Sequence, residues 1–375
     1  MVSIGKTLRN LLKPKSSNVL GIDISSSSVK VVELTKKQGR ASLVTYGELA
    51  LGPYAGAEIG RATNLPVEKV VEALKDILRE SKVSTKNCGV AIPMSSSLIR
   101  LIEMPDLGDE KLKKMIPLEI RKYIPVPITE VLLDWWIIPN EVHESEGSKG
   151  EAPGGGSSTL AKKVDVLVVA IHNDIIARYR DIVKRAELES SFFEIEIFST
   201  LRAVLDRGTK PIMIVDIGAA TTKVYVVEKG IIRSSHIVNS GSQDITLTLS
   251  TARKISVAEA EEEKREKGMN AHTQTESTQG PSVVLENILF EAKRVKISFE
   301  RKSGKKVDFA LFTGGGSMVQ GLNEKATELL ELPTSLADPF SRVEAPSFLE
   351  DLLKKIGPEF SVAIGVALRK LDEGK

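Results

Sequence analysis

The sequence predicts an α/β protein built from two similar lobes, and two observations lead to this fold class. Short β-branched runs alternate with helical patterns, for example an expected strand at 163–171 followed by an expected helix at 174–186. One motif also occurs twice, at Asp23 and at Asp216: an apolar strand, an aspartate, a turn of small residues and a second strand. The alternation indicates α/β architecture, and the repetition indicates that the lobes arose by duplication.

The repeated motif carries the residues that can hold a phosphate. Small residues let backbone N–H groups approach an anion closely. An aspartate beside phosphate requires a cation, and Mg²⁺ bridges carboxylates to phosphate oxygens. One such hairpin is more simply an ordinary turn, but two in the same register predict a shared Mg²⁺-phosphate site. With Asp23 aligned to Asp216, the residues Ser25, Ser26, Ser27 and Ser28 align with Gly218, Ala219, Ala220 and Thr221, and Lys30 aligns with Lys223.

A third element points to the same site. The apolar run 309–312 leads into a Thr-Gly-Gly-Gly-Ser turn at 313–317, where three glycines allow a flat base and ribose to lie against bare backbone. Farther on, the stretch 359–369 is typical of a helix whose small residues, Ala363, Gly365 and Ala367, permit close packing against a sheet or another helix.

The composition excludes several classes of protein. The 52 basic and 50 acidic residues nearly cancel, and no basic stripe is interleaved with aromatics, so we expect no nucleic-acid ligand. A single cysteine, Cys88, excludes an intrachain disulfide and is typical of a reducing compartment. The apolar run 166–171 is far shorter than the roughly 20 residues that cross a bilayer. We therefore expect no transmembrane span.

Three segments are expected to lie outside the packed lobes. Residues 1–17 form a basic amphipathic pattern that fits either a helix on an anionic membrane surface or a helix packed on the protein itself. Segments 144–158 and 268–280 are polar and rich in Gly, Ser or Thr, and we expect flexible insertions there.

A helix is expected at 109–123, stopped by Pro125 and Pro127, followed by a strand at 131–138. In this strand Leu133, Trp135 and Ile137 face one way and Leu132, Trp136 and Ile138 the other, because side chains alternate. Burial of both faces is the commoner explanation of such a pattern. The alternative is that one face meets a partner.

Together these blocks resemble the actin-like ATPase superfamily and, within it, the branch of FtsA and of PilM, the type IV pilus assembly family. The segments IRLIEMPDLGDEKL and LEIRKYIPVPITEVLLDW are the specific ones, because they fall where this branch carries an extra small subdomain. The resemblance implies an actin-like ATPase fold with two duplicated lobes and that subdomain inserted in the first. It implies these boundaries: an N-terminal segment 1–17, first lobe 18–96, inserted subdomain 97–186, return to the first lobe 187–209, second lobe 210–250, outer subdomain 251–305, second lobe with the adenosine turn 306–340, and closing segment 341–375.

The resemblance also assigns roles to residues. Asp23 and Asp216 would bind Mg²⁺ through water, Glu196 and Asp216 are the candidate catalytic carboxylates, and the two turns with Lys30 would hold the phosphates of ATP. Gly314, Gly315, Gly316, Ser317 and Met318 would line the adenosine, with Glu261 and Lys264 near the adenine. By its charge alone, the helix 258–264 would instead be a solvated face.

Two departures from the family pattern bear on activity. Ser25 stands where the family has glycine, and no Gln or His occupies the position that orients the attacking water in actin-type hydrolases. We therefore expect ATP binding with weak or absent hydrolysis.

As partners the resemblance implies the cytoplasmic tail of a PilN-like membrane protein, other pilus-assembly components and self-association, at the inner face of the cytoplasmic membrane. The alternatives are an FtsA-like division protein, a type II secretion homologue or a sugar kinase. FtsA normally ends in an amphipathic membrane helix, which is not expected after Lys375, and the base and sugar-binding loops of a kinase are not found.

Overall fold

The computed structural model describes residues 18–138, 163–206, 208–268 and 280–372. The chain divides into two compact units, Met1–Met94 with Ala177–Lys375, and Ser95–Ile176. Predicted segments 1–17 and 144–158 lie outside the described residues, as does 268–280 apart from its two end residues.

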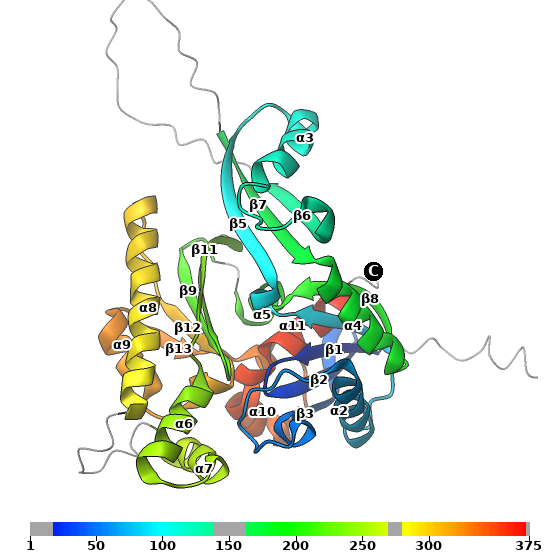
Figure 1. Cartoon of the computed structure of the whole chain (residues 1–375), viewed down its shortest axis with the longest axis vertical. Helices are drawn as coiled ribbons and strands as arrows, with labels where there is room; N and C mark the ends of the chain where they lie inside the picture. The colour runs from blue at the N-terminus through cyan, green and yellow to red at the C-terminus, as the bar shows by residue number, and fades with distance from the viewer. Residues whose placement is uncertain (1–17, 139–162, 207, 269–279, 373–375) are drawn as a thin grey trace, which may run out of the picture. The chain divides into compact units, whose positions relative to one another are not determined.

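The larger unit contains two five-stranded sheets of the same topology (Figure 1). In each sheet three strands form an antiparallel meander, and the remaining two add in parallel beside its first strand. Identical strand order in two sheets confirms the duplicated lobes. The first sheet runs β3 (Arg40–Ala50), β2 (Ser28–Lys37), β1 (Val19–Ile24), β4 (Asn87–Ile92) and β8 (Glu189–Ile195), and the second runs β11 (Ile231–Val238), β10 (Thr222–Glu228), β9 (Ile212–Ile217), β12 (Ala310–Thr313) and β13 (Thr334–Leu336).

The first lobe is packed by helices that bury a single apolar face. In α2 (Val67–Glu80), Val70, Val71, Leu74 and Ile77 recur at helical spacing and are buried. The other helices of this lobe are α4 (Asn173–Arg185, which begins in the smaller unit), α5 (Glu196–Val204), α10 (Glu350–Ile356) and α11 (Ser361–Asp372).

Helix α11 confirms the prediction of a small-residue helix at the end of the chain. It contacts β1, β2, β4 and α5. A Cβ added at Gly365 would collide with the backbone of Ser199 in α5, and one at Gly21 in β1 would collide with the backbone of Ala363 and Ala367. Only residues without a bulky side chain permit this separation between helix and sheet.

In the described part of the second lobe, helices pack around its sheet: α6 (Ser242–Arg253), α7 (Val257–Lys267), α8 (Gly280–Ser303) and α9 (Leu322–Leu330). Helix α7 begins at a capping box, in which the Ser256 hydroxyl accepts from the Glu259 N–H and the Glu259 carboxylate accepts from the Ser256 N–H. Helix α8 contributes six buried residues to the core of this lobe: Leu285, Ile288, Leu289, Ala292, Val295 and Phe299.

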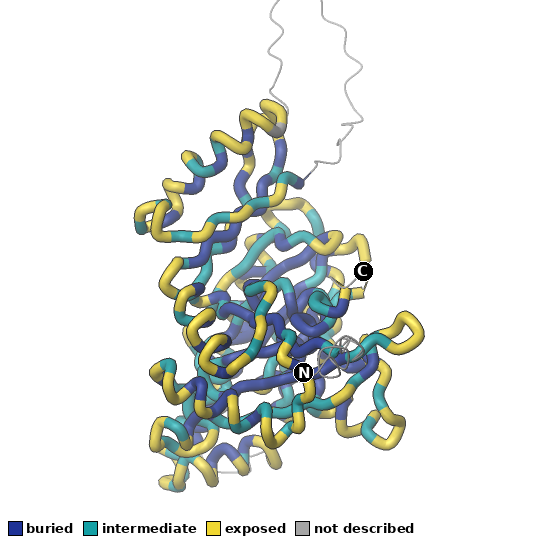
Figure 2. Tube along the Cα trace, turned by 90° about the vertical axis from the view of Figure 1, so that its right-hand side faces the viewer, coloured by how far each residue is buried: buried dark blue, intermediate teal, exposed yellow. Residues whose placement is uncertain are grey.

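Short 3-10 turns connect these elements. They are η1 (Gly52–Ala55), η2 (Met94–Ser96), η3 (Ile128–Glu130), η6 (Gly315–Met318), η7 (Pro339–Arg342), η8 (Ser347–Leu349) and η9 (Gly357–Phe360). Strands β1, β4, β9 and β12 are almost wholly buried, and Figure 2 shows the buried positions of the described chain in dark blue. In the residues described above, no helix combines the length and apolarity needed to cross a membrane.

The smaller unit is an antiparallel sheet in which β7 (Lys163–His172) lies between β5 (Ser97–Pro105) and β6 (Val131–Ile138), with α3 (Asp109–Ile120) packed on it. The helix ends at Ile120 and not at Tyr123 as predicted. The N–H groups of Lys122 and Tyr123 bond to carbonyls three residues back, which tightens the chain before Pro125.

Strand β6 packs on the core of its unit through one face, while the other face is exposed along most of its length and buried only at Ile138, so the expectation that both faces are covered was wrong. Leu133, Trp135 and Ile137 pack on the core of this unit. On the other face Leu132 and Trp136 are 54% and 47% exposed. Helix α3 covers one side of this three-stranded sheet, and the alternating pattern cannot tell which side a helix will cover.

Candidate functional site

The two aspartate hairpins occupy equivalent positions in the two sheets. Asp23 in β1 lies opposite Lys30 in β2, and Asp216 in β9 lies opposite Lys223 in β10. Each aspartate is the penultimate residue of its strand, and both are buried. The sequence register that aligned Lys30 with Lys223 is therefore present in the structure.

In the turn of the first hairpin, the backbone carbonyl groups accept hydrogen bonds that fix the conformation of the turn. The N–H and the hydroxyl of Ser25 each donate to the Ser28 carbonyl at 2.9 Å. The Ser26 carbonyl accepts from the Thr63 N–H, and the Ser27 carbonyl accepts from the Leu51 N–H. In the described chain the N–H groups of Ser26 and Ser27 have no backbone acceptor. They are suited to an anion.

Serine at position 25 does not strain this turn. Among the described residues, the non-glycine positions with positive φ do not include Ser25. Glycine is required only where φ is positive or the backbone must approach closely. The departure from the family pattern therefore leaves the turn geometry accessible.

The second turn is anchored to the start of α6. The Gly218 N–H donates to the Thr221 carbonyl at 3.0 Å, while the carbonyls of Gly218 and Ala219 accept from Ser242 and Gln243 at 2.9 and 3.0 Å. Within the described ranges, the N–H groups of Ala219 and Ala220 have no backbone acceptor. Each of the two turns thus presents two backbone N–H groups that have no backbone acceptor.

Next to the second hairpin, a lysine lies between two carboxylates. Lys223 Nζ is 3.2 Å from Glu196 Oε2 and 3.5 Å from Asp216 Oδ2. Glu196 begins α5, and its Oε1 accepts from the Met94 N–H at 2.7 Å. Burial alone would lower the pKa of Lys223, but Asp216, Glu196 and Asp23 together raise it. Lys223 is not among the residues predicted to bind nucleotide, although the repeat places it opposite Lys30.

Asp23 is electrostatically coupled to the opposite hairpin. Burial raises its pKa to about 7; Lys30 and Lys223 oppose this rise, while the carboxylates of Glu196 and Asp216 add to it. The structure therefore brings Asp23, Glu196 and Asp216 into one electrostatic group.

Lys30 is held by Glu48, a residue that the sequence did not nominate. Its Nζ is 2.9 Å from Glu48 Oε1 and donates to the Ser28 hydroxyl at 2.6 Å. The lysine is buried, and Glu48, Asp23 and Glu359 raise its pKa against the effect of burial. A phosphate would have to compete with Glu48 for Lys30.

The glycine turn packs directly on the second hairpin. Gly314 has φ of 82°, and a Cβ there would collide with Asp216 Oδ1 and the Ile217 carbonyl. Its N–H donates to the Pro358 carbonyl at 2.9 Å. The Ser317 hydroxyl donates to the Gly314 carbonyl at 2.7 Å and is buried, whereas Met318 is half-buried. Glycine at 314 is thus a steric requirement of the site.

Glu261 and Lys264 are buried, so the alternative that their helix presents only a solvated face is wrong for these two residues. Lys264 Nζ is 2.6 Å from Glu261 Oε2, and both groups contact the Thr246 hydroxyl in α6. Burial lowers the pKa of Lys264. Their place near an adenine stays a prediction.

Glu359 adds a second unforeseen carboxyl group near Lys30. A Cβ on Gly315 would lie 3.4 Å from its Oε2. Burial raises the pKa of Glu359 to about 7, repulsion by Glu48 adds to the rise, and Lys30 and Arg265 oppose it. These groups come from β2, β3, α7 and η9, so no local sequence pattern could have connected them.

This pKa predicts a pH-dependent effect of Glu359→Gln on stability. Glu359 has its ordinary pKa near 4.5 when unfolded and about 7 when folded, so the native state holds the extra proton between these values. The contribution of Glu359 to the free energy of unfolding of the wild type therefore falls as pH rises from 4.5 through 7. At pH 8 the variant should be more stable by about 3 kcal/mol, and at pH 4.5 the two proteins should unfold alike. Thermal unfolding across this range measures the difference.

Glu350→Gln, an exposed carboxyl in α10, is the matched control and should leave the pH profile unchanged. Equal unfolding of Glu359→Gln and wild type at pH 8 would contradict the assignment.

The described residues contain no group of three or more His, Cys, Asp or Glu side chains that could hold a metal ion by themselves. Asp23 and Asp216 nevertheless suit Mg²⁺ that keeps its waters and takes further oxygens from phosphate. The donor set fits a metal bound together with nucleotide.

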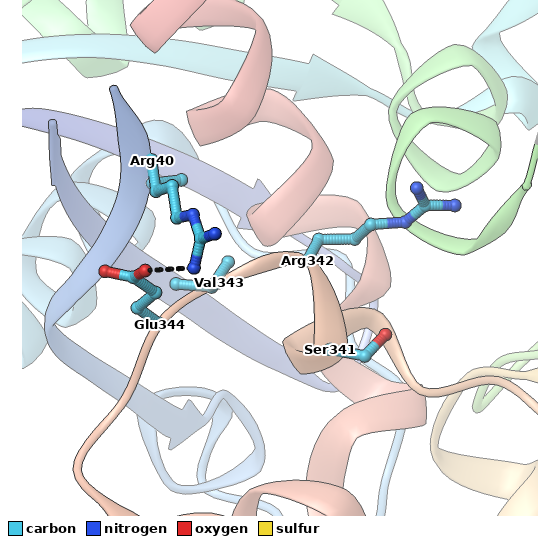
Figure 3. A pocket seen from close by; sticks show the side chains of 6 residues that line it. Arg40, Ser341, Arg342, Val343 and Glu344 are labelled. Atoms are coloured by element: carbon cyan, nitrogen blue, oxygen red, sulfur yellow. Dashed lines mark hydrogen bonds and ion pairs between the residues drawn. The ribbon is translucent and has the colours of Figure 1, made fainter. Parts of the chain in front are cut away.

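An open surface pocket of about 350 Å³ lies elsewhere, between the start of β3 and η7 (Figure 3). Arg40 is paired with Glu344 at 3.1 Å, and Arg342 is bonded to the Leu205 carbonyl and to Asp206. The charged groups of this pocket already have partners, and none of them belongs to the two aspartate hairpins. The pocket is therefore not the candidate site.

Residues 21–371 match the family model of the type IV pilus assembly protein PilM. The chain belongs to this family. A solved structure of a PilM-PilN type IV pilus biogenesis complex is 23% identical with a TM-score of 0.76, covering 94% of this chain and 98% of that one. These findings, with the duplicated sheets, establish an actin-like ATPase fold.

Two further proteins are similar to this chain. The cell division protein FtsA of Neisseria meningitidis serogroup B is 24% identical over 92% of this chain and 88% of its own. The structure of MreB5 of Spiroplasma citri bound to AMPPNP is 12% identical with a TM-score of 0.50, covering 96% of this chain and all of that one.

Proposed function

We propose that this PilM family member binds Mg-ATP between its two aspartate hairpins and, at the inner face of the cytoplasmic membrane, recruits the cytoplasmic N-terminal tail of a PilN-like membrane protein. The observation that carries the nucleotide part is the pair of in-register hairpins, each with two turn amides lacking a backbone acceptor, around Asp23 and Asp216. A related fold solved with AMPPNP supports it. The subdomain boundaries given by the sequence are part of this proposal.

In this proposal each residue has a stated task. Asp23 and Asp216 hold Mg²⁺ through water, and the turn amides bind phosphate oxygens. Lys30 leaves Glu48 to reach a phosphate, and Lys223 stays paired with Asp216 and Glu196. The glycine turn and the pair Glu261 and Lys264 receive the adenosine.

Hydrolysis is proposed to be weak or absent. Glu196 is engaged by the Met94 N–H and by Lys223, and the sequence has no Gln or His at the position that orients the attacking water in actin-type hydrolases. A phosphate-release assay should give a rate well below about 1 per second, under the usual range of enzymes.

Strand β6 is the proposed docking element for the tail. Among the described residues it is an edge strand of its sheet, and such an edge presents backbone groups that can pair with an extended peptide. Exposed Leu132 and Trp136 on the same strand offer apolar contacts for alternate side chains of that peptide. The related structure of a PilM-PilN complex supports a PilN partner.

Replacing Leu132 by glutamate should weaken binding of a PilN-like tail peptide by about tenfold or more, because the loss of a buried aliphatic contact is worth about 1.5 kcal/mol or more. Anisotropy of a labelled peptide measures this. Leu352→Glu, at a similarly exposed leucine in α10, should bind like wild type. Wild-type affinity in the Leu132 variant would reject β6 as the docking element.

An FtsA-like role in cell division is the second candidate, favoured by the relative in Neisseria meningitidis. The gene neighbourhood separates the two. An adjacent gene for a small protein with one membrane span and a short cytoplasmic tail supports pilus assembly, whereas a division-gene cluster supports the alternative.

A further inference from the structure

Helix α8 of the second lobe is apolar on two opposite sides. Its inner side fills the core of the lobe. On its outer side Val283, Phe290 and Ile297 are 48%, 49% and 50% exposed, and they follow one another at intervals of seven residues. The helix is drawn in yellow in Figure 1. Such an outer row has no role in the core.

Seven residues are close to two helical turns, so this spacing places the three side chains in one narrow stripe along the helix. From Val283 to Ile297 the stripe runs about 21 Å at 1.5 Å per residue. We propose that this stripe binds the same stripe of a second copy of the chain, with the two helices antiparallel and a two-fold axis at Phe290.

An antiparallel pair makes the apolar contacts self-complementary. Phe290 meets its own counterpart at the axis, and Val283 meets Ile297 of the second copy at each end. An interface of this kind uses the same patch on both subunits, which closes the assembly as a dimer.

The flanking charges favour the antiparallel direction. On one flank of the stripe Glu286 of one copy falls at the height of Lys293 of the other, and on the opposite flank Arg294 falls beside Asn287. In a parallel pair opposite flanks meet, so Arg294 of one copy would approach Lys293 of the other, and these like charges repel. In the single chain these groups are ion-paired internally, Glu286 with Lys325, Lys293 with Glu331 and Arg294 with Glu291. They can turn to the partner without leaving an unpaired buried charge.

A seam of one helix pair is small compared with the 1,200–2,000 Å² of standard stable interfaces. We therefore expect a concentration-dependent dimer that forms in the micromolar range and weakens with salt. The stripe lies apart from the residues of the hairpins, so dimer formation does not use the nucleotide site.

Sedimentation equilibrium of the full chain tests the seam. Wild type should dimerise, and Phe290→Glu should raise the dissociation constant by about 30-fold or more, because it places two like charges at the axis. Leu352→Glu serves as the control and should dimerise like wild type. A monomer at about 200 µM wild type, or undiminished dimerisation of Phe290→Glu with an unchanged melting temperature, would overturn the proposal.

Disulfide cross-linking tests the direction of the helices. The native Cys88 is buried and does not interfere. A mixture of Val283→Cys and Ile297→Cys chains should form a cross-linked dimer on oxidation, whereas Val283→Cys alone should not, because its two copies lie about 21 Å apart along the seam. Cross-linking of Val283→Cys with itself would show a parallel pair and reject the proposed geometry.

Discussion

Replacing Asp216 by alanine is expected to abolish Mg-dependent ATP binding in calorimetry. The carboxylate would help hold the metal, and it also neutralises Lys223 at 3.5 Å inside a buried group. Truncating one partner of a buried charge pair at a binding site costs about 3 kcal/mol of binding free energy, which is a loss of affinity of about 100-fold. Asp216→Asn keeps the shape and should show the same loss, which separates the charge from the packing.

The matched control is Asp308→Ala, an aspartate of the same lobe that pairs with Lys210 at 2.8 Å on the exposed surface. It should bind Mg-ATP like wild type, because surface ion pairs contribute little. Unchanged affinity in both Asp216 variants, with intact folding by circular dichroism, would remove the nucleotide site from the proposed function.

Replacing Gly365 by valine is expected to give the largest loss of stability. A Cβ at this position would collide with the carbonyl oxygen, the carbonyl carbon and the Cα of Ser199 in α5. All three are backbone atoms, which cannot rotate away as a side chain can. Helix α11 would have to separate from α5 and from the core of the first lobe. We expect a loss of about 3 kcal/mol or more, measured as a clear fall of the melting temperature.

Gly208→Ala provides the comparison, because a Cβ there meets nothing within 4 Å. Its melting temperature should stay close to that of wild type. If Gly365→Val melted like Gly208→Ala, the close approach of α11 to α5 would not hold in solution.

The aspartate hairpins show which features of the fold can be predicted from local sequence. A strand, an aspartate and a run of small residues define a turn by near neighbours alone, so the alignment of Asp23 with Asp216 and of Lys30 with Lys223 follows from residue order. The same holds for the glycine turn. Helix α3 shows a limit, since its pattern continued to Tyr123 while backbone hydrogen bonds ended it at Ile120.

Partners across the fold could not be foreseen. Glu48 holds Lys30 from the neighbouring strand, and Glu359 joins the same group from the C-terminal segment, because sheet pairing and helix packing decide which distant charges meet. The exposed faces of β6 and α8 could not be predicted from the sequence either. Both sequences are apolar on two sides, and only packing determines which side the protein covers.

By itself the sequence determined the duplicated α/β lobes, the two aspartate turns and the small-residue helix, since each follows from residue size, backbone freedom and periodicity over a few neighbours. The tertiary structure alone decided that Lys223 lies between Glu196 and Asp216 and that Val283, Phe290 and Ile297 stay exposed. The reason is physical: burial and electrostatic energy depend on distances between segments far apart in the chain, and those distances exist only once the lobes have folded.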